Sequence, residues 1–310
     1  MSDNLKEKIK EFGLGTKTIN NGHRTLNKDG SFNVTKTNLP FLERFNFFHS
    51  LISMPWWQFF SIILLGYFVI NTFFACLYLW IGVEHLTGIQ GISKTDKFLE
   101  AFFFSAQTIT TLGYGRVAPI GILANIVAAI ESMLGLLSFA LATGMVYGRF
   151  SKPSPKIKYS SHGVIAPFNT INAFMFKIVN PHANQLLEVE AKLTLSMKKD
   201  DFGAREFYGL DLQIPKVVFF PYMWTIVHPI EKDSPLFGLD PESFLEKDVE
   251  FMVTIKAFDE SFSQTVYSRS SYKAAEINWG EKFTNTVKFE NGRMTVDVSR
   301  LDETEKAVLN

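Results

Sequence analysis

Cysteine and net charge are what this 310-residue chain has least of. It contains a single cysteine, and its 31 basic and 31 acidic residues balance to a formal net charge of zero. One cysteine excludes an intrachain disulfide framework and a cysteine-rich metal site. Because Cys76 lies inside an apolar run, we interpret it as a packing residue. The neutral total provides no bulk positive charge for binding a nucleic acid, so we expect no nucleic-acid partner.

The sequence also lacks the residue patterns of common catalytic and metal sites. Its six histidines do not share the spacing of a metal site: His23, His49, His85, His162, His182 and His228. Neither a Ser-His-Asp arrangement nor a phosphate-binding loop occurs in the sequence context that it needs. We therefore expect neither an enzyme nor a bound cofactor.

Long apolar runs are abundant in the first half of the chain. Residues 59–81 form an uncharged run of 23 residues, and residues 119–147 form a second run with one charge, Glu131. Each is long enough to cross a bilayer as a helix. Basic residues flank both spans on one side, namely Lys36 and Arg44 before the first and Arg149, Lys152, Lys156 and Lys158 after the second. The positive-inside rule then predicts a multi-pass protein with both termini in the cytoplasm.

A short polar segment with two glycines, Thr110–Gly115, lies between the two spans. The mostly apolar residues 98–108 precede it and, at about 1.5 Å per residue, cross only about half of a hydrocarbon core about 30 Å thick. The chain must therefore enter the membrane and return, which is tolerated only where protein or water surrounds the irregular backbone. Gly113 and Gly115 allow backbone angles closed to other residues, so the segment can aim carbonyls inward. Four such strands would replace the hydration shell of a potassium ion.

This segment resembles the selectivity filter of potassium channels, and its flanks resemble the inward-rectifier family, particularly its prokaryotic branch. The resemblance implies a filter of residues 111–115 in which K⁺ is coordinated by Thr111, Leu112, Gly113 and Tyr114, followed by Gly115. It also implies a set of filter-supporting residues: Gln107, Thr110, Arg116 and Glu131.

Two residues depart from the family pattern. Leu112 stands where Val or Ile is usual, and its side chain should point away from the ions. Gln107 stands where many members carry Glu, which removes a charge that could pair with a basic residue such as Arg116. Glu131 is an ionisable group inside a span, for which function is the default hypothesis. The alternative is that Glu131 only hydrogen-bonds the pore helix behind the filter.

The second span carries a face of four residues at helical spacing. Ser132, Phe139, Thr143 and Tyr147 are separated by seven, four and four positions. By resemblance this face lines the cavity, Phe139 replaces the acid of strong rectifiers, and the Tyr147 rings close the bundle crossing. The alternative is packing against lipid or another helix. Small residues in the span are typical of close helix packing, and we expect Gly135 and Gly144 to act as hinges.

The basic cluster after the second span has two interpretations. At the least, Arg149, Lys152, Lys156 and Lys158 obey the positive-inside rule. Clustered below a span, they also suggest recognition of anionic lipid headgroups, at about 1 kcal/mol for each charge near the surface. Further on, Ser263, Gln264 and Thr265 correspond by resemblance to the family's cytoplasmic pore loop, and the alternative is an ordinary surface turn.

The second half of the chain has the pattern of β-strands. Apolar and polar residues alternate through 187–195 and 249–257, which indicates half-buried antiparallel strands. Asn291-Gly292 predicts a two-residue hairpin turn, and Asp240-Pro241 predicts the start of a short helix. A short strand is possible near residues 31–34. Four segments resemble the inward-rectifier cytoplasmic domain in the family's order, so that the resemblance spans about residues 39–300: His228–Ile230, Asp233–Leu236, Arg269–Tyr272 and Glu276–Gly280.

Together these observations predict a membrane α plus all-β chain with four regions. Residues 1–38 form a flexible cytoplasmic N-terminus, residues 39–54 an interfacial slide helix, residues 55–150 the transmembrane pore domain, and residues 151–310 a cytoplasmic immunoglobulin-like β-sandwich. Within the pore domain we expect an outer helix at 56–82, a re-entrant pore helix at 96–108, the filter at 111–115 and an inner helix at 119–149.

The function predicted from these residues is that of an inward-rectifier-type potassium channel subunit. It would assemble as a homotetramer in the cell membrane, the bacterial inner membrane if the prokaryotic assignment holds. Gating would occur at the inner-helix bundle crossing under control of the cytoplasmic domain and anionic lipid. Two alternatives remain open: a weakly selective cation channel, suggested by Leu112 and Gln107, and a membrane-anchored ligand sensor with a non-conducting pore.

Overall fold

The chain folds as two compact units. The membrane unit comprises residues 38–152, and the β unit comprises residues 1–37 together with residues 153–310. The computed structural model describes residues 23–35, 37–38, 40, 47–151, 157–182, 184–199, 204–220, 223–290 and 292–310. Lys36, Arg44, Lys152 and Lys156 of the predicted basic clusters therefore lie outside the described residues.

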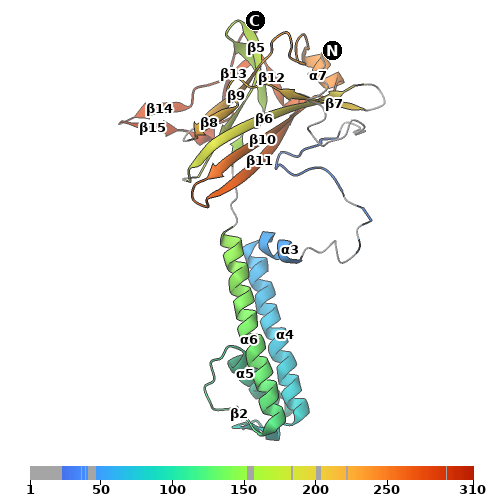
Figure 1. The fold of residues 1–310 in the computed structure, drawn as a ribbon, viewed down its shortest axis with the longest axis vertical. Coiled ribbons are helices and arrows are strands. Elements are labelled where there is room, and N and C mark those ends of the chain that lie inside the picture. Colours follow the sequence, from blue (N-terminus) through green and yellow to red (C-terminus); the bar gives the residue numbers. More distant parts are fainter. Residues whose placement is uncertain are drawn as a thin grey trace. The chain divides into compact units, whose positions relative to one another are not determined.

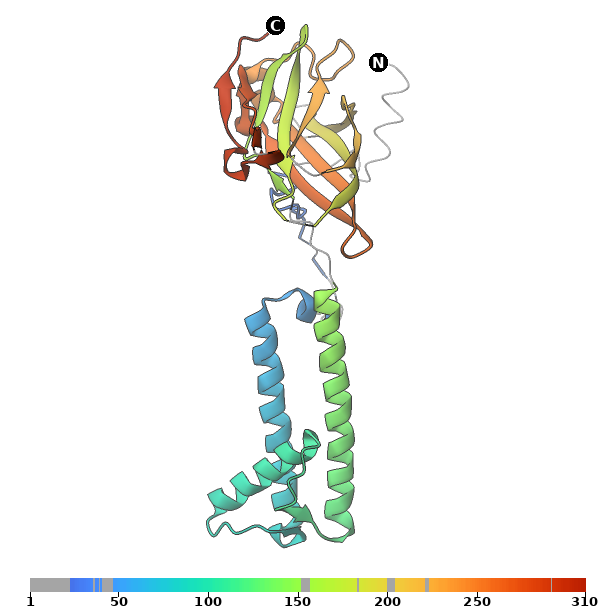
Figure 2. The ribbon, with the colours of Figure 1, turned by 90° about the vertical axis from the view of Figure 1, so that its left-hand side faces the viewer.

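Two long apolar helices dominate the membrane unit. Helix α4 (Trp56–Ile81) and helix α6 (Gly121–Phe150) are each long and apolar enough to cross a membrane. Figures 1 and 2 show them side by side, with the shorter helix α5 (Lys94–Ile109) inclined between them near one end. Helix α5 has 16 residues, a length of about 24 Å, so it enters the membrane without crossing it.

The start of α5 is fixed by a capping box. The Ser93 hydroxyl accepts a hydrogen bond from the Asp96 N–H at 3.1 Å, and the Asp96 carboxylate accepts one from the Ser93 N–H at 3.2 Å. The helix then packs its aromatic residues against α4, where the Tyr78 and Phe104 rings meet edge to face with centroids 5.1 Å apart. It begins two residues before the predicted start and ends one residue after the predicted end.

The segments before and after α5 are tied together. Strands β1 (Leu86–Thr87) and β2 (Ala118–Pro119) form a two-stranded antiparallel ladder beyond a short 3₁₀ turn, Val83–His85. The predicted slide helix of residues 39–54 is described only in its last part, as α3 (Phe47–Ser53). Residues 41–46 lie outside the described residues.

The β unit contains two five-stranded sheets. One sheet is formed by β3 (Lys158–Tyr159), β4 (Gly163–Phe168), β5 (Ile171–Val179), β9 (Met223–Pro229) and β12 (Ile277–Trp279). The other is formed by β6 (Leu186–Lys198), β7 (Arg205–Leu210), β8 (Lys216–Phe219), β10 (Glu250–Asp259) and β11 (Gln264–Lys273). Neighbouring strands are antiparallel except for the parallel pair β12 and β4.

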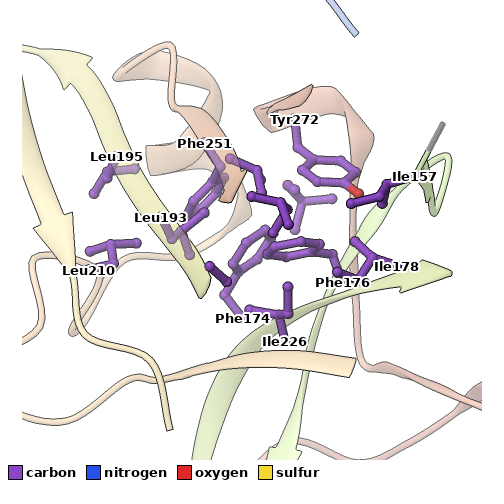
Figure 3. Close-up of a cluster of buried hydrophobic side chains, with 14 of the residues drawn as sticks. Ile157, Phe174, Phe176, Ile178, Leu193, Leu195, Leu210, Ile226, Phe251 and Tyr272 are labelled. Carbon is purple, nitrogen blue, oxygen red and sulfur yellow. The ribbon is translucent and has the colours of Figure 1, made fainter. Parts of the chain in front are cut away.

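The core of the β unit is made by aliphatic and aromatic side chains from both sheets (Figure 3). The Phe174 ring of β5 stacks on the Phe251 ring of β10, with centroids 3.9 Å apart and planes 8° from parallel. The Phe176 and Tyr272 rings lie beside them, with centroids 5.4 Å apart. Contacts of this kind join the inner faces of the two sheets into a sandwich. The predicted fold, membrane helices followed by an all-β sandwich, is confirmed.

The predicted alternation in residues 187–195 is wrong at its first residue. Val189, Ala191, Leu193 and Leu195 are buried as expected, but Leu186 is buried in place of Leu187. The cause is a β-bulge, since the register between β6 and β10 shifts by one residue and Glu188 has a φ of +49°. An extra residue in one strand moves every side chain beyond it to the other face.

Smaller elements include the two predicted from turn chemistry. Helix α7 (Pro241–Glu246) begins after Asp240, whose carboxylate accepts a hydrogen bond from the Ser243 N–H at 2.8 Å. Strands β14 (Val287–Glu290) and β15 (Arg293–Val296) pair as the predicted hairpin, with Glu290 opposite Arg293. Strands β13 (Glu281–Phe283) and β16 (Thr304–Lys306) form a further pair, and two 3₁₀ turns lie at Ala274–Glu276 and Val298–Arg300.

Residues 24–32, within the N-terminal segment predicted to be flexible, pack on strands of the β unit, and the flexibility of residues 1–38 stays a prediction. The Glu250 carboxylate accepts hydrogen bonds from the N–H groups of Thr25 and Leu26 at 2.9–3.0 Å. Leu26 is buried against Phe207 and Met252. The possible strand at residues 31–34 reduces to one bridge between Phe32 and Leu26, because the segment folds back on itself.

Candidate functional site

The segment after α5 has an unusual backbone. Thr111, Gly113 and Gly115 have φ angles of +58°, +52° and +81°, whereas the alternate residues Leu112 and Tyr114 do not have positive φ. Alternation of this kind turns successive peptide groups the same way, with N–H groups on one side and carbonyls on the other. A β-branched residue with positive φ is strained, and such strain is typical of functional sites. The segment can therefore present a row of carbonyl oxygens to one ligand.

The end of the pore helix holds the first half of this row. The Gln107 carbonyl accepts hydrogen bonds from the N–H groups of Leu112 and Gly113 at 2.8 and 3.3 Å, and the Thr108 carbonyl accepts one from the Thr111 N–H at 3.0 Å. The Thr110 hydroxyl donates back to the Ala106 carbonyl at 2.6 Å. Gln107 thus supports the segment through its backbone. The carbonyl end of a helix carries partial negative charge, which favours a cation nearby.

Glu131 of α6 joins that helix to α4 and α5. Its side chain is fully buried and accepts hydrogen bonds from the Tyr78 hydroxyl of α4, at 2.7 Å, and from the Ser105 hydroxyl of α5. The Ser105 hydroxyl also lies 3.0 Å from Oδ1 of the buried Asn71. Hydrogen bonding of Glu131 to the pore helix was the structural alternative in the sequence, and this contact is present.

Sequence reasoning missed Asn71, Tyr78 and Ser105 as partners of Glu131. Asn71 and Ser105 are polar residues inside apolar segments, which was the available signal, because such groups need partners in a membrane. Their meeting at Glu131 depends on how three helices are packed, and no spacing within one helix could predict it.

Arg116, which follows the row of carbonyls, pairs with a residue that the sequence analysis did not consider. Its Nη1 and Nη2 atoms both lie 3.2 Å from Oε1 of Glu100 in α5. Nη1 also donates to the Gly88 carbonyl at 3.4 Å. Arg116 therefore has an acidic partner in Glu100, although position 107 carries Gln and not Glu.

The four residues of the predicted inner-helix face differ in their exposure. Phe139, Thr143 and Tyr147 are exposed on α6 in the single chain, and the Phe139 and Tyr147 side chains are 72% and 73% exposed. Ser132 is half-buried instead, with its hydroxyl 3.5 Å from the Thr108 carbonyl.

The two glycines predicted as hinges have different environments. A Cβ added at Gly135 would overlap the Ile109 carbonyl at the end of α5, whereas a Cβ at Gly144 would meet open space. Helix α6 runs unbroken through both glycines. Close packing accounts for Gly135, and the hinge role of both glycines stays a prediction.

Of the four predicted lipid-binding residues, the structure describes Arg149, in the membrane unit, and Lys158, in the β unit. The Arg149 guanidinium donates to the carbonyls of Leu51 and Met54 near the end of α3. It also lies over the Trp56 and Phe59 rings, 4.3 and 4.7 Å from their centroids. Arg149 is thus engaged within the membrane unit, while Lys158 is exposed on β3 and Lys152 and Lys156 lie outside the described residues.

The predicted cytoplasmic pore loop is the turn between β10 and β11. Ser263 has a φ of +50°, and Gln264 and Thr265 are exposed at the start of β11. The Asp259 carboxylate accepts hydrogen bonds from the N–H groups of Ser261 and Phe262 at 2.9 and 3.4 Å. The turn therefore has a defined shape in the single chain.

Comparison with known proteins gives matches over most of the chain. Residues 157–309 match the model of the inward rectifier potassium channel C-terminal domain, and residues 45–152 match a model described as ion channel. The inward rectifier potassium channel Kirbac3.1 of Paramagnetospirillum magnetotacticum is 32% identical over 289 residues, which cover 90% of this chain and 95% of the relative.

Two mouse proteins are more distant relatives. Inward rectifier potassium channel 4 is 26% identical over 328 residues, covering 91% of this chain and 72% of the relative. G protein-activated inward rectifier potassium channel 3 is 26% identical over 306 residues, covering 91% of this chain and 77% of the relative. The similarity thus extends through both units of the chain.

Proposed function

The chain belongs to the inward rectifier potassium channel family, as its residues indicated, and on that premise we propose that it is one subunit of a homotetrameric potassium channel. Each chain contributes one Thr111–Gly115 segment, so four copies around an axis are needed to enclose an ion. Potassium would exchange its water shell for carbonyl oxygens and move down its gradient without an energy source. The subunit would be a transporter of ions and not an enzyme.

The observation that carries this proposal is the backbone of residues 111–115. The alternation of φ at Thr111, Gly113 and Gly115 supports a single row of carbonyls, which is the chemistry that a dehydrated potassium ion requires. We assign its coordination to the carbonyls of Thr111, Leu112, Gly113 and Tyr114. The side chain of Leu112 would then point away from the ion.

We place the gate at the cytoplasmic end of α6. Tyr147 has an exposed ring there, and Thr143 and Phe139 lie about one and two turns earlier, respectively, on the same helical face. Four Tyr147 rings at a bundle crossing would close the pore by excluding water. Because Phe139 carries no charge, block by internal polyamines is expected to be weak at this position.

Anionic lipid is the proposed regulator. Arg149 already has carbonyl and aromatic partners, so we assign headgroup recognition mainly to Lys152, Lys156 and Lys158, at about 1 kcal/mol per charge. The protein would be a multi-pass protein of the cell membrane with both termini in the cytoplasm, and the bacterial inner membrane is the expected site.

The experiment that tests the proposal is ion flux into liposomes that contain the purified protein. We expect uptake of K⁺ over Na⁺ that barium blocks, and a higher open probability for Tyr147→Ala in single-channel recordings. The matched control is Gly113→Ala, because an L-residue is disfavoured at a φ of +52° although a Cβ there meets open space. That variant should lose selective flux while still assembling.

Other outcomes separate the alternatives. Barium-insensitive flux of K⁺ and Na⁺ alike would indicate a weakly selective cation channel and implicate Leu112 and Gln107. Absence of flux in wild type and Tyr147→Ala, in every lipid composition, would contradict the proposal and favour a membrane-anchored sensor.

A further inference from the structure

Lys177 is a charged residue that is buried on the outer face of a sheet in the β unit. It belongs to β5, whose Phe174 and Phe176 side chains lie in the core between the two sheets. Alternation along the strand places Lys177, like Met175, on the opposite face. The segment of residues 283–287 lies against Lys177 there, and the residue is only 4% exposed. A buried ammonium group is costly unless an anion accompanies it.

The partners of Lys177 are neutral groups. Its Nζ atom donates a hydrogen bond to the Thr284 carbonyl at 2.6 Å and lies 5.1 Å from the centroid of the Phe283 ring. No carboxylate in the described part of the chain forms an ion pair with Lys177, and Glu303, whose charge acts on it from a distance, is paired with Arg300. Burial lowers the pKa of Lys177. An ammonium group has three N–H donors, so two of them remain for a further acceptor.

A cavity of about 290 Å³ opens at Lys177. Thr225 of β9 lines it and pairs directly opposite Lys177, so the two side chains share one face of the sheet. Asn285 also lines the cavity. Its Oδ1 atom accepts a hydrogen bond from the Val287 N–H at 3.0 Å, which leaves its NH₂ group as a donor. Met223 and Val287 add apolar surface to the same wall.

The chemistry of the cavity favours one class of ligand. One ammonium group balances one negative charge, whereas a phosphate group carries about 1.5 to 2 negative charges at neutral pH. A carboxylate has one charge and two oxygen atoms that accept several hydrogen bonds. The apolar part of the lining provides room for a short hydrocarbon chain.

We propose that this cavity binds a small organic monocarboxylate. The carboxylate accepts hydrogen bonds from Lys177, Thr225 and Asn285. Its hydrocarbon chain packs on Met223 and Val287. The site goes beyond the proposed channel function, because binding there does not require that the protein conduct ions.

The test uses butyrate as the probe and saturation-transfer difference NMR on the purified full-length protein in detergent. Butyrate should give saturable signals, and its methyl protons should receive more saturation than the protons beside the carboxylate. Butyramide has the same shape without the charge and should bind about tenfold more weakly, since it loses a charge-assisted hydrogen bond. Acetate should bind more weakly by about fourfold for each buried CH₂ group that it lacks.

Two variants locate the binding at this cavity. Lys177→Gln should weaken butyrate binding by about tenfold, because the ammonium group is lost. Thr225→Val keeps the volume of the side chain and removes one hydroxyl, so it should weaken binding by about fivefold. It also keeps the test decisive if Lys177→Gln does not fold. Lys192→Gln is the matched control, since it removes a lysine of β6 whose side chain is 75% exposed, and it should bind butyrate as wild type does.

Three results would overturn the proposal: no saturable butyrate signal in wild type, wild-type affinity in both Lys177→Gln and Thr225→Val, or equal binding of butyramide and butyrate. Inorganic phosphate that displaces butyrate at equal concentration would contradict the assignment to monocarboxylates, because it would show a site for anions in general. The channel function fails separately. A protein that carries no K⁺ and still binds butyrate as described would contradict the channel and support this site.

Discussion

Glu131 in the membrane unit and Glu250 in the β unit are both fully buried carboxylates, and they have different partners. Glu131 accepts hydrogen bonds from two hydroxyls, those of Tyr78 and Ser105. Glu250 accepts hydrogen bonds from two backbone N–H groups and lies 4.0 Å from the Lys273 ammonium. The first acid is held by neutral dipoles alone, and the second has a cation within reach.

Two arginines, one in each unit, repeat the contrast. Arg149 in the membrane unit donates to two carbonyls and stacks on two aromatic rings. Arg205 in the β unit forms an ion pair of 2.6 Å with Asp248, which also binds Lys273 at 2.8 Å. Membrane helices carry few charged residues because each charge is costly in lipid. A charged side chain there seldom has an oppositely charged neighbour, so neutral polar groups and aromatic rings contact it instead. In the β unit, loss of one charge removes an ionic partner from a group of opposite charge.

The largest effect should follow from breaking the charge network of the β unit. The Arg205 side chain is fully buried and contacts both Asp248 and Ser196. Arg205→Met leaves the part-buried Asp248 carboxylate with Lys273 as its remaining cation and should lower the free energy of unfolding by about 3 kcal/mol. Chemical denaturation of the full-length protein, followed by tryptophan fluorescence, measures the change.

The control is Lys216→Ala, which removes an ion pair with Glu188 in which both side chains are at least half exposed. Its expected cost is about 0–1 kcal/mol. Equal costs for the two substitutions would show that burial does not distinguish the two pairs.

The stability of the membrane unit should depend on the hydrogen-bond acceptors of Glu131 and not on its charge. Glu131→Leu leaves the hydroxyls of Tyr78 and Ser105 without their acceptor, at about 1–3 kcal/mol for each. Glu131→Gln retains one amide oxygen and should cost about half as much. The thermal stability of the purified protein in detergent measures the effect of both substitutions. Equal losses for Leu and Gln would mean that the charge is what the helices require.

Close packing takes the place of ion pairs where α5 meets α6. Gly135→Ala should destabilise the membrane unit by about 1–3 kcal/mol, because the new methyl group overlaps the Ile109 carbonyl. Gly144→Ala is the matched control and should be neutral or slightly stabilising, since its position is open. Melting temperatures in detergent compare them, and matching losses would show that both glycines are needed for bending rather than for contact.

The contrast between the units also explains what the sequence could predict. The apolar runs of α4 and α6, the alternation in β10 and the Asp240 cap are local patterns, and each indicated its element before the structure. The bulge at Glu188 was not predictable, because it is a relation between β6 and β10. The packing of residues 24–32 was missed for the same reason, since Glu250, which binds the N–H groups of Thr25 and Leu26, is more than 200 residues away.

Among the site residues, the Thr111–Gly115 segment stood out because its glycines and its place between two spans are visible in the sequence. Its support was only partly predictable. Glu131 stood out as a charge in an apolar run, but Glu100 looked like an ordinary polar residue at the start of a helix. Arg149 was assigned to lipid from its position, whereas its contacts with Leu51 and Met54 depend on how α3 meets α6.

His228 is an exception to this contrast, because it is a titratable group of the β unit whose hydrogen-bond partners are neutral. Its Nδ1 atom lies 2.6 Å from the Asp211 carbonyl, and its Nε2 atom lies 2.8 Å from the Ser234 hydroxyl. Burial lowers the pKa of His228, and this outweighs the opposing effects of Asp211, Asp233 and Glu231. The unfolded chain therefore binds a proton more readily than the folded protein does.

The sign of the pH dependence follows from that difference. Above about pH 6.5 the imidazole is neutral in both states and costs nothing. As the pH falls below that value, the unfolded state gains a proton and stability declines, until the pH reaches the lowered pKa of the folded state. The melting temperature of wild type should therefore fall more steeply between pH 6.5 and pH 5 than that of His228→Asn. Parallel curves would mean that the folded protein also protonates His228, and that dipoles and hydroxyls in the β unit tolerate a charge as the membrane unit tolerates Arg149.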